Sequence, residues 1–543
     1  MSQKLFPSWV CFLRLLLVVI CSAFLLTSVA CVGSSGVSEV TFDVTEKSIR
    51  DLNSALESRL VTSQDLVHLY YERIESFDRR GPVLNSVITL NSNALSDAAR
   101  LDEERLNGDV RGPLHGIPVL VKDNYDTFDM PTTAGTLGLA TSMPPDDAFQ
   151  IRRLREAGAV ILGKTNMHEL ARGITTVSSL TGQTRNPYDP SRNPGGSSGG
   201  TGAAIGASFA AVGMGSDTCG SIRIPSSHQA LVGLRGTRGL ASGDGIIPLS
   251  TTQDIGGPLA RSVEDLAIIL DATVGYDPED PTTQLSRGNV PDSYTEYLDS
   301  DSLKGARLGI VMSLMGSGRP EQPVRDVIEA AIQEMVEQGA EIIEIEEPDL
   351  TELLQGASVI GQEFKFDFDS YLKQTPGAAV GSLREMISLG LYHEIIDPGL
   401  HASLDYESRD TDDYRDRLEK RSQVRTTTVG VMDEHQLDAL VYPTIRQTAR
   451  PIGQSQPGSS CALSAISGLP AISVPAGFAV DGMPVGVELL GRPFAESQLI
   501  SLAFAFEQNT FHREPPDFTP SLVTFPLPVD LEATMIAATD VSG

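Results

Sequence analysis

The chain is poor in the residues that build metal centres and disulfide scaffolds. Its 543 residues include five cysteines and eight histidines. Three of the cysteines fall within the first 31 residues, which leaves only Cys219 and Cys461 in the body. Two cysteines so far apart do not make a disulfide framework, and neither a Cys-x-x-Cys pair nor a histidine-rich spacing suggests zinc. We therefore expect no metal site and no cofactor.

Positive charge is also scarce. Lysine and arginine total 41 against 71 aspartates and glutamates, which gives a formal net charge of −30. A surface of this sign repels phosphate backbones, so the composition argues against a nucleic-acid partner. We interpret the excess as a solvated acidic shell that keeps the protein soluble.

The N-terminus carries the pattern of a secretory signal. Lys4 and Arg14 precede Leu15–Ala30, an uncharged run of sixteen residues, and small residues flank Cys31. This order of positive, apolar and small residues is typical of a signal peptide, here over residues 1–30. The cysteine resembles that of a bacterial lipobox, which would make it the lipidated first residue of a mature chain tethered in the cell envelope or periplasm. Plain cleavage and a retained anchor remain alternatives, although ~16–18 apolar residues are short for a membrane span.

Apolar runs alternate with helical periodicity through the body of the chain. This predicts an α/β fold in one large domain over residues 44–520, after a tether (31–43) and before an acidic tail (521–543). We expect a mixed central β-sheet covered by helices on both faces. Strands are predicted at 116–121, 160–162, 306–311, 341–345, 440–441, 471–474 and 485–490.

Helices are indicated by capping residues and by apolar stripes. Thr62 and Ser63 are candidate N-caps of one helix, and the small residues 203–211 predict another that packs closely on its neighbours. A helix over 324–336 separates two predicted strands, and this order favours parallel pairing. The polar stretch 350–430 is irregularly helical and shows no chemistry of its own, although it is a candidate to shape a pocket.

Three segments carry candidate chemistry: Lys122 after a buried apolar run, the glycine-rich loop 195–200, and residues 217–223. Burial lowers the pKa of a lysine, and a neutral amine is a usable general base. A lysine that simply reaches solvent from a strand end is the alternative. The glycine-rich loops indicate backbone amides directed at an anion, either a phosphate or a developing oxyanion.

Two other motifs, a P-loop and a nucleophile elbow, are excluded by the residues around the glycine-rich loop. A P-loop needs Lys and then Ser or Thr after its last glycine, and no lysine follows Gly200. Residues 196–200 match Gly-x-Ser-x-Gly, which would make Ser198 a nucleophile at a strand-to-helix elbow. Pro190 and Pro194 precede this match and exclude the central strand that an elbow requires.

The ordered motifs instead resemble the amidase signature family. Residues 186–202 read with 212–225 look like its Gly/Ser-rich signature, and the resemblance extends over roughly residues 45–510. Further blocks similar to those of the family are 116–123, 163–169, 256–263, 468–471 and 486–493. The resemblance implies a hydrolase that cleaves a carboxylic amide through an acyl-enzyme.

The resemblance also implies a catalytic triad. Ser221 is then the nucleophile, Ser197 a bridging serine held by a cis peptide bond, and Lys122 the final base. A serine hydroxyl is a poor nucleophile until a base removes its proton, and a lysine acting through a second serine would supply that base.

The residues around the triad receive supporting roles. Backbone N–H groups of Thr218, Cys219, Gly220 and Ser221 would line the oxyanion hole. Ser198 would support its loop by hydrogen bonding. Asp217 and Arg223 are expected to form a structural ion pair.

Several alternatives stay open. Cys219 stands where many relatives have glycine; it is either a small buried side chain or itself a nucleophile, with Lys122 and Glu169 as partners. The chain could instead be a subunit that releases ammonia from glutamine for tRNA-linked amidation, or a non-catalytic binding lipoprotein. The kind of amide and the oligomeric state do not follow from the sequence.

Overall fold

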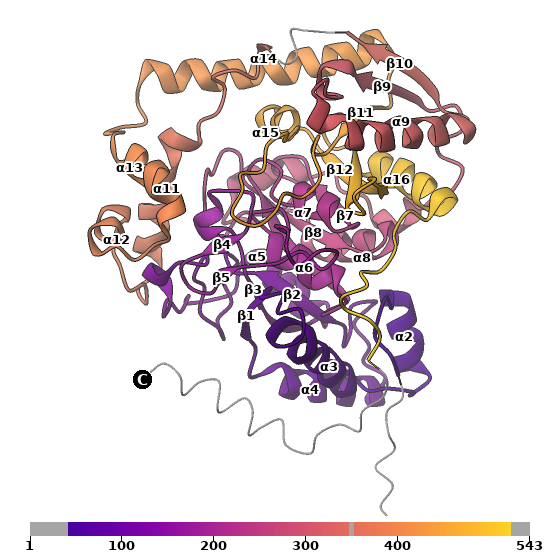
Figure 1. The fold of residues 1–543 in the computed structure, drawn as a ribbon. Helices are drawn as coiled ribbons and strands as arrows, with labels where there is room; N and C mark the ends of the chain where they lie inside the picture. The colour runs from indigo at the N-terminus through magenta and orange to yellow at the C-terminus, as the bar shows by residue number, and fades with distance from the viewer. Residues whose placement is uncertain (1–41, 347–351, 523–543) are drawn as a thin grey trace, which may run out of the picture. The chain divides into compact units, whose positions relative to one another are not determined.

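The predicted apolar runs form strands of one large sheet in the computed structural model, which describes residues 42–346 and 352–522 (Figure 1). Eleven strands lie side by side in it. In sheet order they are β1 (Val87–Leu90), β3 (Val160–Thr165), β2 (Pro118–Lys122), β6 (Val212–Asp217), β8 (Ile255–Ala260), β7 (Val232–Arg235), β12 (Ala471–Phe478), β13 (Pro484–Leu490), β11 (Ala439–Pro443), β9 (Arg307–Val311) and β10 (Glu341–Ile345). The separate pair β4 (Val177–Ser178) and β5 (Gly182–Gln183) is antiparallel.

The sheet is mixed, as expected for this α/β fold. Strands β3, β2 and β6 run parallel, and so do β11, β9 and β10. The other neighbours pair in antiparallel orientation. The predicted parallel pairing of β9 with β10 is therefore confirmed. The expected fold class, a large α/β domain with a mixed sheet, is confirmed as well.

Helices flank the sheet (Figure 1). They are α2 (Ile49–Glu57), α3 (Ser63–Arg73), α4 (Ala94–Asn107), α5 (Phe149–Glu156), α6 (Gly199–Gly206), α7 (Arg223–His228), α8 (Val263–Thr273), α9 (Gln322–Glu337), α11 (Ile360–Gln374), α12 (Leu383–Leu389), α13 (Asp397–Leu404), α14 (Asp412–Glu434), α15 (Ala462–Ser467) and α16 (Glu496–Thr510). The cap predicted for α3 is confirmed: Thr62 accepts from the N–H of Asp65, and the Asp65 carboxylate accepts from the N–H of Thr62.

Helix α6 lies earlier in the chain than the sequence predicted. It was expected over 203–211 but spans Gly199–Gly206, so it begins inside the glycine-rich loop. The reason is a close backbone approach: Gly200 donates to the carbonyl of Asn166 at 3.1 Å. A Cβ on Gly200 would lie 2.0 Å from that same oxygen. The glycines therefore shorten the loop and let the helix pack against the end of β3.

Figure 1 shows α11, α12 and α13 grouped together, followed by the long α14. This is the stretch in which the sequence indicated irregular helices. Its buried Phe364, Phe368 and Leu383 form one apolar cluster with Met167 and Leu249 from the main body of the fold. The helices thereby close over the loops that follow β3 and precede β8.

Some expectations concern residues outside the described ranges. The signal peptide over 1–30, Cys31 and nearly all of the acidic tail lie there. Within the described residues, no helix is both long enough and apolar enough to cross a membrane.

The close approach of α6 to Asn166 is testable with two glycines of the same helix. Gly200→Ala is expected to lower the free energy of unfolding by about 3 kcal/mol, because the new methyl overlaps a backbone oxygen. Gly206→Ala is the control, since its Cβ would meet nothing nearer than Pro187 at 3.4 Å. It should change the free energy by less than about 1 kcal/mol. Urea unfolding measures both, and equal effects would contradict the packing described here.

Candidate active site

Lys122 ends β2 with its side chain fully buried. Its Nζ lies 2.8 Å from the Oγ atoms of both Ser197 and Ser216, and 3.3 Å from the Ser216 carbonyl oxygen. Burial lowers the pKa of this amine to about 7, although the more distant Asp217 and Asp254 act to raise it. Much of Lys122 is therefore neutral near pH 7, as a general base must be.

The sheet explains why Lys122 and Ser216 meet. Strands β2 and β6 are parallel neighbours, with Val121 opposite Met214. The carboxyl ends of parallel strands lie at the same edge of a sheet, and ligand sites of α/β folds commonly occur there. Lys122 follows Val121 directly, and Ser216 comes two residues after Met214. Their side chains therefore meet at this edge of the sheet.

Ser197 lies in the turn that leads into α6, and the Gly196–Ser197 peptide bond is cis. The neighbouring Ser198 holds this turn in place. Its N–H donates to the Ser221 carbonyl at 3.1 Å, and its Oγ donates to the Ser216 carbonyl at 3.1 Å. The turn is thus joined to the end of β6 and to the segment that carries Ser221.

The segment from Thr218 to Ser221 presents backbone N–H groups at the site. The N–H of Gly220 donates to Asp217 Oδ1 at 2.7 Å. It therefore shapes the turn, although it was expected in the oxyanion hole. The N–H groups of Thr218, Cys219 and Ser221 have no acceptor among the described residues, so these three are available to a ligand oxygen. Thr218 is held by its side chain, which donates to Asp254.

Asp217 and Arg223 form a buried ion pair, with Nε of the arginine 3.1 Å from Oδ2. Arg235 contacts the same carboxylate, while Arg223 also pairs with Glu488. Tyr442 donates to Glu488 at 2.9 Å. Burial alone would raise the pKa of the Asp217 carboxyl, but the two arginines outweigh it and hold that pKa well below its usual range. This network fixes the turn before Ser221.

Sequence reasoning missed Ser216, Arg235 and Glu488. Ser216 directly precedes the recognised segment, and its position beside Asp217 was the one available signal. Arg235 and Glu488 come from β7 and β13, which lie far from the signature in the chain. No spacing rule connects them to Asp217, because sheet order alone brings these strands together.

Cys219 and Cys461 form a disulfide bond, with Cα atoms 5.2 Å apart. The sequence predicted no disulfide framework from two cysteines so far apart and gave no sign of this single bond, because pairing depends on spatial separation and the fold closes a gap of 242 residues. The alternative role of Cys219 as a nucleophile is overturned, since a disulfide sulfur carries no thiolate. Glu169, its supposed partner, instead accepts from Ser179 and from the N–H of His393.

Ser221 lines a cavity of about 360 Å³. Thr218 and Cys219 lie beside it on the same wall, and Arg172 contributes the cavity's one charged side chain. The other walls are mostly apolar and come from Ala171, Gly173, Ile174, Leu249, Ile360, Ile395, Ile396, Pro398 and Gly399. The stretch 350–430 therefore does shape a pocket, through α11, α13 and the 3₁₀ turn between Glu394 and Ile396.

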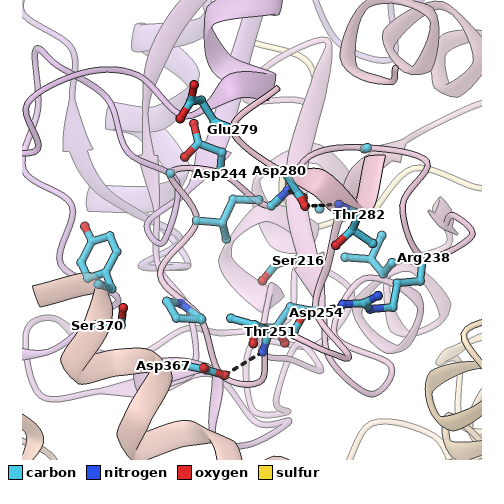
Figure 2. Close-up of a pocket in the computed structure, with 18 of the residues that line it drawn as sticks. Ser216, Arg238, Asp244, Thr251, Asp254, Glu279, Asp280, Thr282, Asp367 and Ser370 are labelled. Carbon is cyan, nitrogen blue, oxygen red and sulfur yellow. Dashed lines mark hydrogen bonds between the residues drawn. The ribbon is translucent and has the colours of Figure 1, made fainter. Parts of the chain in front are cut away.

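A second cavity, of about 530 Å³, reaches Ser216 but not Ser221 (Figure 2). It is polar and acidic. Its carboxylates belong to Asp244, Asp254, Glu279, Asp280 and Asp367, against the two arginines Arg238 and Arg409. The larger cavity is therefore not the one that Ser221 lines. Across residues 42–346 and 352–522, no three His, Cys, Asp or Glu side chains are grouped to hold a metal ion.

Comparison with known proteins gives consistent matches over most of the chain. The family model described as Amidase matches residues 65–500. A probable amidase of Arabidopsis thaliana is 35% identical over 88% of this chain and 93% of its own. A glutamyl-tRNA(Gln) amidotransferase subunit of Thermoanaerobacter pseudethanolicus is 34% identical over 86% of this chain and 97% of its own. The structure of a peptide amidase from Stenotrophomonas maltophilia matches with a TM-score of 0.81 and 38% identity, covering 88% of this chain and 99% of that one.

The disulfide predicts a shared loss of stability. Cys219→Ala, Cys461→Ala and the double variant should each lower the free energy of unfolding by about 2–5 kcal/mol. The double variant should lose no more than either single one, because all three remove the same bond. Thermal unfolding with and without a reductant measures this. Reduction should lower the stability of the wild type to that of the variants. Additive losses would show that the two cysteines act separately.

Proposed function

This chain belongs to the amidase family and is a hydrolase of carbon–nitrogen amide bonds; from that premise we propose that it works through Ser221, Ser197 and Lys122. The observation that carries the proposal is the contact between Lys122 Nζ and Ser197 Oγ, in a site where burial lowers the pKa of the amine to about 7. A buried lysine bonded to hydroxyl oxygens is suited to accept a proton.

The reaction begins with a proton relay. Lys122 takes the proton of Ser197, and Ser197 takes that of Ser221, whose oxygen attacks the amide carbonyl. The carbonyl oxygen becomes negatively charged and accepts from backbone N–H groups of the segment Thr218–Ser221, among which those of Thr218, Cys219 and Ser221 have no acceptor within the described residues. The carbon–nitrogen bond then breaks, and the relay returns the proton to the departing amine.

Water completes the cycle. It attacks the ester that joins the acyl group to Ser221 and gives its proton to the same relay. Cleavage of the ester releases the carboxylic acid and restores the serine hydroxyl. The Asp217 network keeps the turn in one arrangement throughout, so that little reorganisation is needed as charge develops.

The protein is proposed to act outside the cytoplasm. Structural disulfides are characteristic of oxidising compartments, and Cys219–Cys461 is one. The N-terminal pattern of a signal peptide with Cys31 at its end supports the same conclusion. A lipid on Cys31 would tether the enzyme to the membrane, and the mass of the mature N-terminus tests this.

A glutamine-hydrolysing component of a tRNA-dependent amidotransferase is the second candidate, because one relative of this kind is 34% identical. The acidic composition disfavours it, since a tRNA-bound partner carries negative charge. Hydrolysis of free glutamine faster than of a panel of peptide amides, anilides and acyl amides would reverse this preference. A purely binding protein would hydrolyse none of them.

The proposed triad predicts the behaviour of three variants. Ser221→Ala, Ser197→Ala and Lys122→Ala should each reduce kcat by about 10,000-fold, because each breaks the single relay that activates the nucleophile. Combining two of them should reduce kcat little further, since the residues act as a unit. The control is Ser96→Ala, an exposed position on α4. If the Ser221→Ala variant had the same kcat as the wild type, the proposed triad would be excluded.

The lowered pKa of Lys122 predicts a pH dependence. Below its pKa of about 7 the lysine is protonated and accepts no proton, so kcat/KM should fall about tenfold for each pH unit on the acid side. Above that value the amine is neutral and the rate should level off. Assays from about pH 5 to about pH 9 with a substrate that does not ionise in this range measure it. If kcat/KM did not fall as the pH drops below about 7, Lys122 would not be the base.

A further inference from the structure

Arg172 is the charged residue in the wall of the cavity that holds Ser221. It follows directly on the 3₁₀ turn η3 (Glu169–Ala171), in which Leu170 and Ala171 both have left-handed backbone angles. The arginine lines the cavity next to Ala171, Gly173 and Ile174.

The guanidinium of Arg172 is held from two sides. Its Nη2 donates to the Gly399 carbonyl at 2.9 Å, and its central carbon lies 4.5 Å from the centre of the Phe364 ring. Gly399 leaves room for this arrangement, because a Cβ there would lie 2.9 Å from Nη2 and 3.3 Å from Nε. The side chain is therefore fixed in position.

The other terminal nitrogen of the guanidinium, Nη1, lacks a hydrogen-bond acceptor among the described residues. This nitrogen is also buried. No carboxylate of the described part of the chain forms an ion pair with Arg172, although acidic residues outnumber basic ones by 30 in the sequence. Burial lowers its pKa to about 10, so the group is still a cation at neutral pH.

A purely structural role explains part of this arrangement. The bond to Gly399 fastens α13 to the loop after β3, and one N–H group suffices for it. It does not explain a second, buried N–H group without an acceptor, which costs free energy unless something binds there. Nor does it explain a cation without a carboxylate partner in the cavity that reaches the reactive serine.

We propose that Arg172 binds a carboxylate of the substrate, so that the enzyme selects amides carrying an acidic group separated from the scissile bond by an apolar segment. A planar guanidinium matches a carboxylate through two parallel hydrogen bonds. Leu249, Ile360 and Ile396 would contact the apolar segment between the two ends. The proposal rests on the function proposed above, since it describes a further part of the same site.

The test uses substrates that differ in one charge. N-succinyl-leucine p-nitroanilide is compared with its methyl ester, which adds one methyl group and removes the negative charge of the carboxylate. The expected kcat/KM of the wild type is roughly 10- to 100-fold higher for the acid, the usual effect of a hydrogen bond to a charged group. Rising salt should shrink this ratio, because ions screen the attraction.

Variants assign the preference to Arg172. Arg172→Gln should bring the acid-to-ester ratio to about one, and Arg172→Lys should keep a smaller preference, since an ammonium lacks the paired geometry. Gly399→Ala should lower the ratio by displacing the guanidinium. Arg384→Gln removes an exposed arginine of α12 outside the cavity and should leave the ratio unchanged. A wild-type ratio of one or below, or a preference that survives in Arg172→Gln, overturns the proposal.

Binding separates this proposal from the catalytic one. The two compounds are titrated calorimetrically into Ser221→Ala, which binds without turnover, and into Ser221→Ala with Arg172→Gln. Tighter binding of the acid, lost with Arg172, supports the carboxylate site even if the wild type hydrolyses neither compound. Equal binding of acid and ester by Ser221→Ala counts against the carboxylate site even if amide hydrolysis is found.

Discussion

The burial of one lysine is the constraint on which the rest of the site depends. Lys122 ends a strand whose every residue is buried, so its amine cannot be hydrated and its charged form is disfavoured. Ser197 and Ser216 supply hydroxyl oxygens to this amine, where a carboxylate would have kept it charged. The glycine-rich turn places Ser197 next to the amine. The same turn leads directly into α6 and so determines where that helix begins.

A second set of interactions holds the reactive segment from the other side. Asp217 is surrounded by two buried arginines, and it accepts the N–H of Gly220 as well. The disulfide from Cys219 joins the same segment to α15. The ion network therefore holds Asp217 and the disulfide bond holds Cys219, both a few residues before Ser221. Removing one partner of a buried ion pair is costly, because it leaves an uncompensated charge.

The cavity that Ser221 lines combines two distant parts of the chain. Its reactive wall comes from the turn after β6, while its apolar wall comes largely from α11, α13 and the turn between them. In the proposed mechanism the signature residues supply the reaction, while a separate helical segment lines much of the cavity. Arg172 stands at the boundary of these two parts, bonded to Gly399 of α13. If the proposed mechanism holds, a change in those helices alters the choice of amide and leaves the proton relay intact.

The sequence by itself determined the fold class, most of the strands and the segments that meet at the site. Continuous apolar runs revealed β2, β3 and β13, and Lys122 stood out at the end of one of them, because local composition carries that information. The resemblance to the amidase signature family is what singled out Ser197 and Ser221. The tertiary structure alone decided which residues support them. Arg235, Glu488 and Cys461 reach the reactive segment through sheet order and chain closure, and Arg172 faces the cavity through an irregular turn. Contacts between residues hundreds of positions apart follow from packing of the whole chain, and no local pattern encodes them.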